Sequence, residues 1–297
     1  MSKEIAYIGR FAPSPTGPLH LGSLATALGS WLDARMHGGN WLVRIEDIDT
    51  ERCKSQWSEE ILRCLRAHGL HWDGTPWVQS QRSNAYSQAL HTLANKGLTY
   101  PCACTRKDLD EANQHRAPGQ HRVYPGTCRH GLPEGRTARA VRFVCPDQPV
   151  QWSDHRLGLN TEHLPTTSGD FVLVRGDGQW AYHLAVVVDD IESGVTHIVR
   201  GEDLAETTAR QVAVWQALGG STAPSHWHLP VILAEDGQKL SKQTGALALD
   251  HGQPIENLNT VWRHFGMQAF QTPTLTKWLA QALDLWPQYR ASQSHLS

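Results

Sequence analysis

The sequence predicts an α/β fold with a parallel sheet, because strand-like and helix-like segments alternate along the chain. Ile5 to Phe11 is an apolar run typical of a buried strand, and the proline-rich loop 13–18 ends it. Apolar residues then recur at helical spacing from Leu21 to Leu32, until Gly38 and Gly39 end the segment. Trp41 to Ile45 is the next expected strand. A strand, a loop, a helix and a second strand within about forty residues form a βαβ unit.

The same alternation resumes after an interruption between Pro101 and Pro165, which carries four of the six cysteines. The other expected elements are helices at 59–68, 85–95 and 204–218, strands at 140–144, 171–175, 184–188, 195–199 and 229–233, and two or three short helices after Gly252. The expected organisation is 1–99 for the first half of the main sheet, 100–165 for an insertion, 166–250 for the second half of the sheet, and 251–297 for a helical end.

Composition indicates a globular protein. The chain has 297 residues, of which 40% are hydrophobic and 19% charged, so neither disorder nor a fibrous repeat fits. The net charge of -2 argues against coating nucleic acid through bulk charge. The longest strongly apolar stretch, 184–188, is too short to span a membrane, and the N-terminus lacks the apolar core of a secretory signal. We therefore expect a cytoplasmic protein without membrane contact.

Two polar motifs lie far apart in the sequence, one near the start of the expected α/β region and one near its end. His20 and Gly22 stand where the first loop meets the first helix, and helix N-termini bind phosphate through free backbone N–H groups. There His20 is suited to stabilise charge on a transferring phosphoryl group. Far downstream, Lys239 and Lys242 flank a serine in a glycine-bearing loop, where two ammonium groups suit a triphosphate. Either motif alone is common on surfaces without function, and Walker and dinucleotide fingerprints are missing.

Taken together, the two motifs resemble the signatures of the class I aminoacyl-tRNA synthetases. They read His20-Leu21-Gly22-Ser23, for the HIGH-type sequence, and Lys239-Leu240-Ser241-Lys242-Gln243, for the KMSKS-type sequence. The segments that resemble the glutamyl subgroup in order and spacing are Arg10 to Gly17, Arg44 to Asp49, Tyr182 to Asp190 and Arg200 to Asp203. The resemblance implies a Rossmann-type parallel sheet with a zinc-binding insertion and a short helical C-terminus.

The resemblance also implies a glutamate site. Glutamate has two carboxylates and one ammonium, so its site needs cations and one anion in fixed positions. The implied anion for the ammonium is Glu46, and the implied residues around the rest of the substrate are Arg10, Phe11, Ala12, Pro13, Ser14, Tyr182 and Arg200. Taken singly, Arg10 and Glu46 also fit an ordinary ion pair and Tyr182 a core position.

ATP is the second substrate that the resemblance implies, with Mg²⁺ expected beside it. The implied ATP-binding residues are His20, Gly22 and Lys242, and the implied catalytic residues are His20, Lys239 and Lys242. Together they would assist attack of the substrate carboxylate on the α-phosphate, mainly by positioning the reactants and neutralising charge.

Three cysteines of the insertion have the character of a metal site. Cys102 and Cys104 are close in sequence, and Cys128 follows after a loop, whereas zinc prefers four ligands. From chemistry alone His121 or His130 is the better fourth ligand, because imidazole binds zinc more readily than phenol does. The family resemblance instead favours Tyr124 and implies one structural zinc ion. The alternative is a set of three reduced cysteines without metal.

Several features narrow the resemblance to a shortened branch of the subgroup. Only 55 residues follow Lys242, so no anticodon-binding domain is expected, and Ala25 and Gln243 stand where the long enzymes usually have arginine. Members of this branch activate glutamate without tRNA and transfer it to the cyclopentene-diol of queuosine, at the wobble position of aspartate tRNA. The resemblance thus implies glutamate, ATP and that tRNA as partners of a monomer. The alternatives are a truncated synthetase that charges the terminal ribose and a non-catalytic paralogue that binds tRNA or amino acid as a regulator.

Overall fold

The main sheet of the computed structural model, which describes residues 6–117, 120–220, 222–232 and 248–294, has two parts. The first contains β1 (Ile8–Phe11), β2 (Asn40–Ile45) and β3 (Trp77–Val78), all parallel and in that order. The second, in the order β7-β6-β10-β9, contains β6 (Val150–Asp154), β7 (Gly158–Glu162), β9 (His197–Gly201) and β10 (Ser225–Leu229). Within it β9, β10 and β6 are parallel, and β7 is antiparallel to β6.

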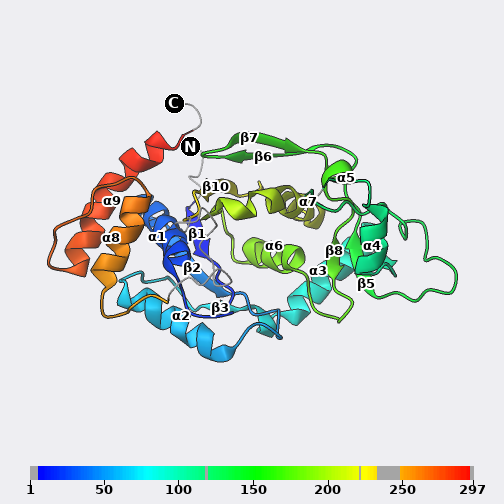
Figure 1. The fold of residues 1–297 in the computed structure, drawn as a ribbon, viewed down its shortest axis with the longest axis horizontal. Coiled ribbons are helices and arrows are strands. Elements are labelled where there is room, and N and C mark those ends of the chain that lie inside the picture. Colours follow the sequence, from blue (N-terminus) through cyan, green and yellow to red (C-terminus); the bar gives the residue numbers. More distant parts are fainter. Residues whose placement is uncertain (1–5, 118–119, 221, 233–247, 295–297) are drawn as a thin grey trace.

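The two parts meet at β1 and β9. The N–H of Thr196, just before β9, donates to the carbonyl of Ile8 at 2.9 Å, and the Thr196 hydroxyl accepts the N–H of Ile8 at 2.9 Å. The strands therefore form one continuous layer, between two groups of helices (Figure 1).

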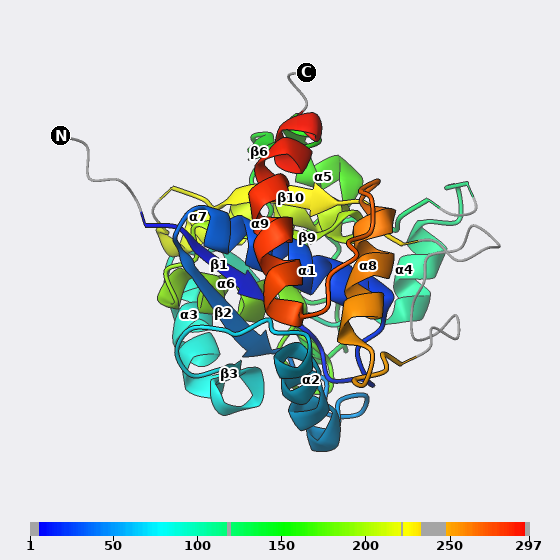
Figure 2. The ribbon, with the colours of Figure 1, turned by 90° about the vertical axis from the view of Figure 1, so that its left-hand side faces the viewer.

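The first group of helices packs around α1 (Leu21–Met36). The C-terminal helices α8 (Pro254–His264) and α9 (Leu275–Ser292) cross it, as Figure 2 shows. The second group contains α3 (Ser83–Asn95), α6 (Tyr182–Glu192) and α7 (Thr208–Leu218). The helix α2 (Ser55–Ala67) follows β2, and the 3₁₀ turns η1 (Gln79–Gln81) and η2 (Glu202–Thr207) precede α3 and α7.

A separate small sheet lies at the other end of the molecule from α8 and α9 (Figure 1). Its strands β4 (Thr99–Cys102), β5 (Ala140–Phe143) and β8 (Val172–Val174) pair antiparallel. The short helices α4 (Arg106–Ala112) and α5 (Leu164–Thr167) accompany it. We had placed the strand near 171–175 in the main sheet, but it pairs with β5, whereas β6, from within the expected insertion, joins β10.

Most of the expected elements are confirmed, but the strand at 184–188 is wrong, because this segment is the middle of α6. Every residue from Leu184 to Asp190 is buried. A helix covered on all sides is apolar all round, so its sequence shows no helical period and reads like a buried strand.

The strand expected at 229–233 is also misplaced, because β10 ends at Leu229. Pro230 follows it and has no N–H to donate to the sheet. The true strand was overlooked because two of its buried side chains are His226 and His228, which are polar.

The C-terminal helices share an aromatic core with the sheet. Trp286 of α9 is fully buried, and its ring centroid lies 5.4 Å from that of Trp227 on β10. The rings of Phe265 and Tyr289 lie 5.6 Å and 4.9 Å from it. This cluster fastens the last helices to the sheet. In the part of the chain that the structure describes, no helix is long and apolar enough to cross a membrane.

We predict that Trp286→Ala lowers the free energy of unfolding by about 3–5 kcal/mol, because it leaves a large cavity among rings that cannot close around it. Urea denaturation of the purified variant measures this loss. Gln288→Ala, on the exposed side of the same helix, serves as the matched control and should change the stability by less than about 0.5 kcal/mol. Equal effects of the two substitutions would show that the aromatic cluster does not hold α9.

Candidate active site

The strand order reverses between β1 and β9. From β1 the sheet continues to β2 and β3, and from β9 it continues in the opposite direction to β10 and β6. In an open parallel sheet, the crevice at the carboxyl ends of the strands at such a point is where ligands bind. A cleft of about 400 Å³ lies there, between the loop after β1 and the end of β9.

Most of the predicted site residues line this cleft, although they come from distant parts of the chain. Those that line it are Arg10, Phe11, Ala12, Pro13, Ser14, His20, Gly22, Tyr182 and Arg200. The predicted residues Lys239 and Lys242 lie outside the described residues.

His20 is the N-cap of α1. Its ring Nδ1 accepts the backbone N–H of Ser23 at 3.3 Å, so the ring proton is on Nε2. The start of α1, with Gly22 and Ser23, forms part of the cleft wall. The positive end of a helix dipole and its free N–H groups therefore border the cleft, an arrangement that suits phosphate.

Arg200, at the end of β9, is a buried cation with only neutral partners. It is 3% exposed. Its guanidinium donates to Gln211 Oε1 at 2.7 Å, Thr208 Oγ1 at 2.9 Å and His228 Nε2 at 3.1 Å. No carboxylate among the described residues lies within 4.0 Å of it. Burial lowers the pKa of Arg200, yet guanidinium keeps its proton in proteins. The cleft wall therefore carries a positive charge that no described carboxylate neutralises.

Arg10, at the end of β1, differs from Arg200 because it is paired with a carboxylate. Its Nε donates to Asp190 on α6 at 3.2 Å, and Arg44 Nη1 donates to the same carboxylate at 2.7 Å. Burial by itself would raise the pKa of Asp190, but the two guanidinium groups outweigh it and lower the pKa. Asp190 is therefore ionised and holds two strand ends against α6.

Glu46 and Tyr182 border a second cavity of about 320 Å³, which shares Ser14, Thr16 and Tyr182 with the cleft. Glu46 is buried and accepts a hydrogen bond from Arg44 at 3.2 Å. Burial is the main cause that raises its pKa, and the neighbouring arginines oppose the rise. The predicted anion thus lines the neighbouring cavity rather than the cleft itself.

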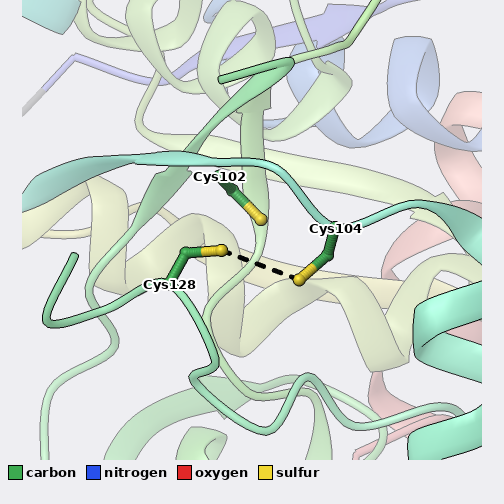
Figure 3. A group of neighbouring side chains, drawn as sticks. All are labelled: Cys102, Cys104 and Cys128. Carbon is green, nitrogen blue, oxygen red and sulfur yellow. Dashed lines mark hydrogen bonds between the residues drawn. The ribbon is translucent and has the colours of Figure 1, made fainter. Parts of the chain in front are cut away.

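The three cysteines of the predicted metal site come together in the insertion, where their sulfur atoms point toward one another (Figure 3). Cys104 Sγ lies 3.7 Å from Cys128 Sγ, and Tyr124 Oη lies 3.5 Å from Cys102 Sγ and 3.8 Å from Cys104 Sγ. Ligands at ordinary zinc–sulfur distances around a tetrahedral ion are about 3.8 Å apart. The four atoms therefore fit a tetrahedral zinc ion.

Hydrogen bonds to Cys102 favour its thiolate form, which is the form that binds a metal ion. The Nε of Arg142 donates to Cys102 Sγ at 3.1 Å. Burial by itself would raise the pKa of Cys102, but its hydrogen bonds with Tyr124 and Arg142 bring the pKa below the ordinary value. Neither histidine considered as a fourth ligand joins the cluster, since His121 contacts Glu206 at 2.7 Å and His130 is exposed.

Arg44 and Asp190 lie within motifs of the sequence but have no role that the motifs imply, and Gln211 and His228 lie outside every motif. The signal available for Asp190 was two adjacent acidic residues at the end of an apolar run, where charges are rarely buried without partners. For His228 it was the two-residue spacing from His226, which matches the period of a strand.

Comparison with known proteins agrees with this arrangement. Residues 8–273 match the family of class I tRNA synthetases (E and Q), catalytic domain. The chain belongs to this family. It therefore has the class I α/β fold with a parallel sheet, and it is an aminoacyl-tRNA synthetase-like ligase.

Within the family, the chain is a homologue of the glutamyl-Q tRNA(Asp) synthetases. It is 52% identical to the one from Cupriavidus metallidurans, over 94% of this chain and 91% of that protein. It is 48% identical to the one from Albidiferax ferrireducens, over 94% of this chain and 97% of that protein. The resemblance to the shortened glutamyl branch is thereby confirmed.

Among solved structures, a glutamate tRNA ligase from Elizabethkingia meningosepticum in complex with its amino acid matches with a TM-score of 0.69 and 32% identity. The match covers 80% of this chain but 52% of that one. The chain thus spans about half the length of the solved ligase.

We predict that Asp190→Asn lowers the free energy of unfolding by about 3–5 kcal/mol at neutral pH, because the buried Arg10 loses its carboxylate partner and Arg44 loses the nearest of its three. Since folding lowers the pKa of this carboxyl group, its contribution is present above the ordinary value and is lost as the pH falls through the lowered one. The difference from the wild type should be constant from about pH 7 to 5 and should shrink below about pH 4.

Urea denaturation across this pH range measures the difference, with the exposed Asp284→Asn on α9 as control. A difference that stays the same at acid pH would contradict an ionised Asp190.

Proposed function

We propose that the protein activates glutamate with ATP, without tRNA, and transfers the glutamyl group to the cyclopentene-diol of queuosine at the wobble position of aspartate tRNA. The observation that carries the first step is Arg200, a buried cation that has no carboxylate partner among the described residues and lines the same cleft as the N-terminus of α1. A carboxylate substrate and a polyphosphate can therefore meet in one cavity.

In the first step, an oxygen of the substrate's α-carboxylate attacks the α-phosphorus of ATP, and the bond to the leaving pyrophosphate breaks. The chain's part is to place the two anions side by side against their mutual repulsion. Arg10, Ser14, Tyr182 and Arg200 hold the carboxylates and Glu46 binds the ammonium. His20 and Gly22, with Lys239 and Lys242, stabilise the charge that develops on the phosphates.

In the second step, a hydroxyl oxygen of the acceptor attacks the carbonyl carbon of glutamyl-adenylate. AMP leaves, and the hydroxyl proton passes to the leaving phosphate or to water. The support for queuosine as acceptor is the name that the similar proteins carry, together with similarity over more than nine-tenths of their length.

Glutamate-dependent ATP/pyrophosphate exchange, with purified protein and no RNA, tests the first step. We expect exchange with glutamate, and little with glutamine, because an amide in place of the side-chain carboxylate leaves the cations of the cleft with one counter-charge fewer. Exchange that begins only when tRNA is added would favour a truncated synthetase that charges the terminal ribose. No exchange in either condition would favour a non-catalytic paralogue. Transfer of labelled glutamate to aspartate tRNA with and without queuosine tests the acceptor.

We also propose that Cys102, Cys104, Tyr124 and Cys128 bind one structural zinc ion. Zinc supplies no chemistry to adenylate formation, so its role there is to hold together a loop-rich segment. We predict about one zinc ion per purified chain and loss of most of it in Cys128→Ser, since a hydroxyl replaces a thiolate ligand. Elemental analysis and thermal unfolding measure both effects.

Cys145→Ser is the matched control, because Cys145 is equally buried but donates its thiol proton to the Gly169 carbonyl, outside the cluster. A full zinc content in Cys128→Ser, or an equal loss in Cys145→Ser, would contradict the assigned ligands.

A further inference from the structure

Arg200 is the first of three buried groups that are linked by hydrogen bonds and end at a carboxylate on another strand. The guanidinium Nε donates to His228 Nε2 at 3.1 Å, and His228 Nδ1 donates to Asp154 Oδ2 at 2.6 Å. The three residues are 3%, 0% and 5% exposed. Because guanidinium can only donate, His228 Nε2 must accept, and the ring proton must therefore be on Nδ1. The geometry leaves one tautomer of His228.

Asp154 is itself fully engaged. Its Oδ1 accepts the backbone N–H groups of Arg156 at 2.9 Å and Leu157 at 2.8 Å, and its Oδ2 also accepts the N–H of His228 at 3.1 Å. Burial would raise the pKa of Asp154, but its hydrogen bond with His228 and those with the backbone lower it. Asp154 is therefore an ionised acceptor that turns and holds the imidazole.

The imidazole of His228, which lies between Arg200 and Asp154, is neutral. Burial is the main cause that lowers the pKa of His228, and the contact with Asp154 only partly opposes it. Arg200 thus receives a directional acceptor without receiving a negative charge. Arg10 shows the alternative, because direct contact with Asp190 positions its guanidinium and also neutralises it.

We propose that His228 and Asp154 are positioning residues, which orient the Arg200 guanidinium toward the substrate carboxylate while leaving its charge available for that carboxylate. The inference rests on the proposed function and deepens it. It also gives β6 a role in the site, since this strand lies beside β10 in the main sheet and carries Asp154 at its end.

The test compares His228→Leu, which fills similar space without an acceptor, with His228→Gln, whose side-chain carbonyl can still accept from Arg200 Nε. We expect His228→Leu to raise the KM for glutamate in pyrophosphate exchange by about 10- to 100-fold, because a misdirected guanidinium no longer matches the carboxylate. The KM for ATP should change less than about 2-fold, and His228→Gln should recover most of the loss.

Asp154→Asn tests the tautomer. The backbone N–H groups of Arg156 and Leu157 retain the amide oxygen, so the amide nitrogen faces His228 Nδ1 and donates to it. The ring proton then moves to Nε2, where it opposes the N–H of Arg200. We expect a rise in the glutamate KM larger than that of His228→Gln.

His226→Leu is the matched control. His226 is buried on the same strand, and its ring centroid lies 6.0 Å from that of His228. In the described part of the chain, its side chain forms no hydrogen bond with a residue assigned to substrate binding. It should leave the glutamate KM unchanged. Calorimetric titration with glutamate alone gives a second readout that does not depend on turnover.

A wild-type glutamate KM in Asp154→Asn or in His228→Leu would overturn the proposal. A KM for ATP that rises as much as the KM for glutamate would also overturn it. So would a His226→Leu variant with the same effect as His228→Leu, or a His228→Gln variant whose glutamate KM is no lower than that of His228→Leu. If His228→Leu does not fold, the comparison of Asp154→Asn with His228→Gln tests the proposal, and a glutamate KM in Asp154→Asn that is no higher than in His228→Gln would overturn it. A wild type that neither binds nor exchanges glutamate overturns the proposed function and this proposal together, whereas normal wild-type exchange with unaffected variants overturns this proposal alone.

Discussion

The buried ion pairs between the sheet and α6 are the constraint on which the rest of the structure depends. Asp190 binds Arg10 of β1 and Arg44 of β2, and its neighbour Asp189 binds Arg82 at 2.6 Å. Charges taken out of water must find partners, and breaking one pair leaves another charge exposed to an apolar interior. These contacts join residues that are more than a hundred positions apart, and they hold α6 against β1, β2 and the start of α3. The same contacts place Tyr182, at the start of α6, against the cleft.

The two buried arginines of the cleft show that a guanidinium group can be oriented either with or without neutralising its charge. Arg10 is held by a carboxylate and so serves the fold as much as the substrate. Among the described residues, Arg200 is held by an amide, a hydroxyl and an imidazole, all of which are neutral. Its positive charge is therefore available to pair with a substrate carboxylate. Under the proposed function, this difference favours an acid over its amide, because a neutral ligand would leave a buried cation unpaired.

The insertion and the main sheet exchange strands, and this exchange connects the insertion to the sheet that carries the cleft. β8 leaves the second half of the chain to complete the small sheet, while β6 leaves the insertion to extend the main one. The insertion has a small core of its own around Tyr100, Tyr124 and Cys128. The three cysteine sulfur atoms that lie close together belong to this part of the chain.

The sequence by itself determined the βαβ start of the fold, the loop and helix that carry His20, and the cysteine spacing, because these depend on local period, turn residues and short-range geometry. It also placed the cleft residues in the correct family order. Only the tertiary structure decided that the run at 184–188 is a helix, since burial on every side removes the period from the pattern. It alone decided the partners of Arg10 and Arg200 and joined Asp154 to His228, because those contacts depend on which strands become neighbours, and strand order is a property of the whole chain.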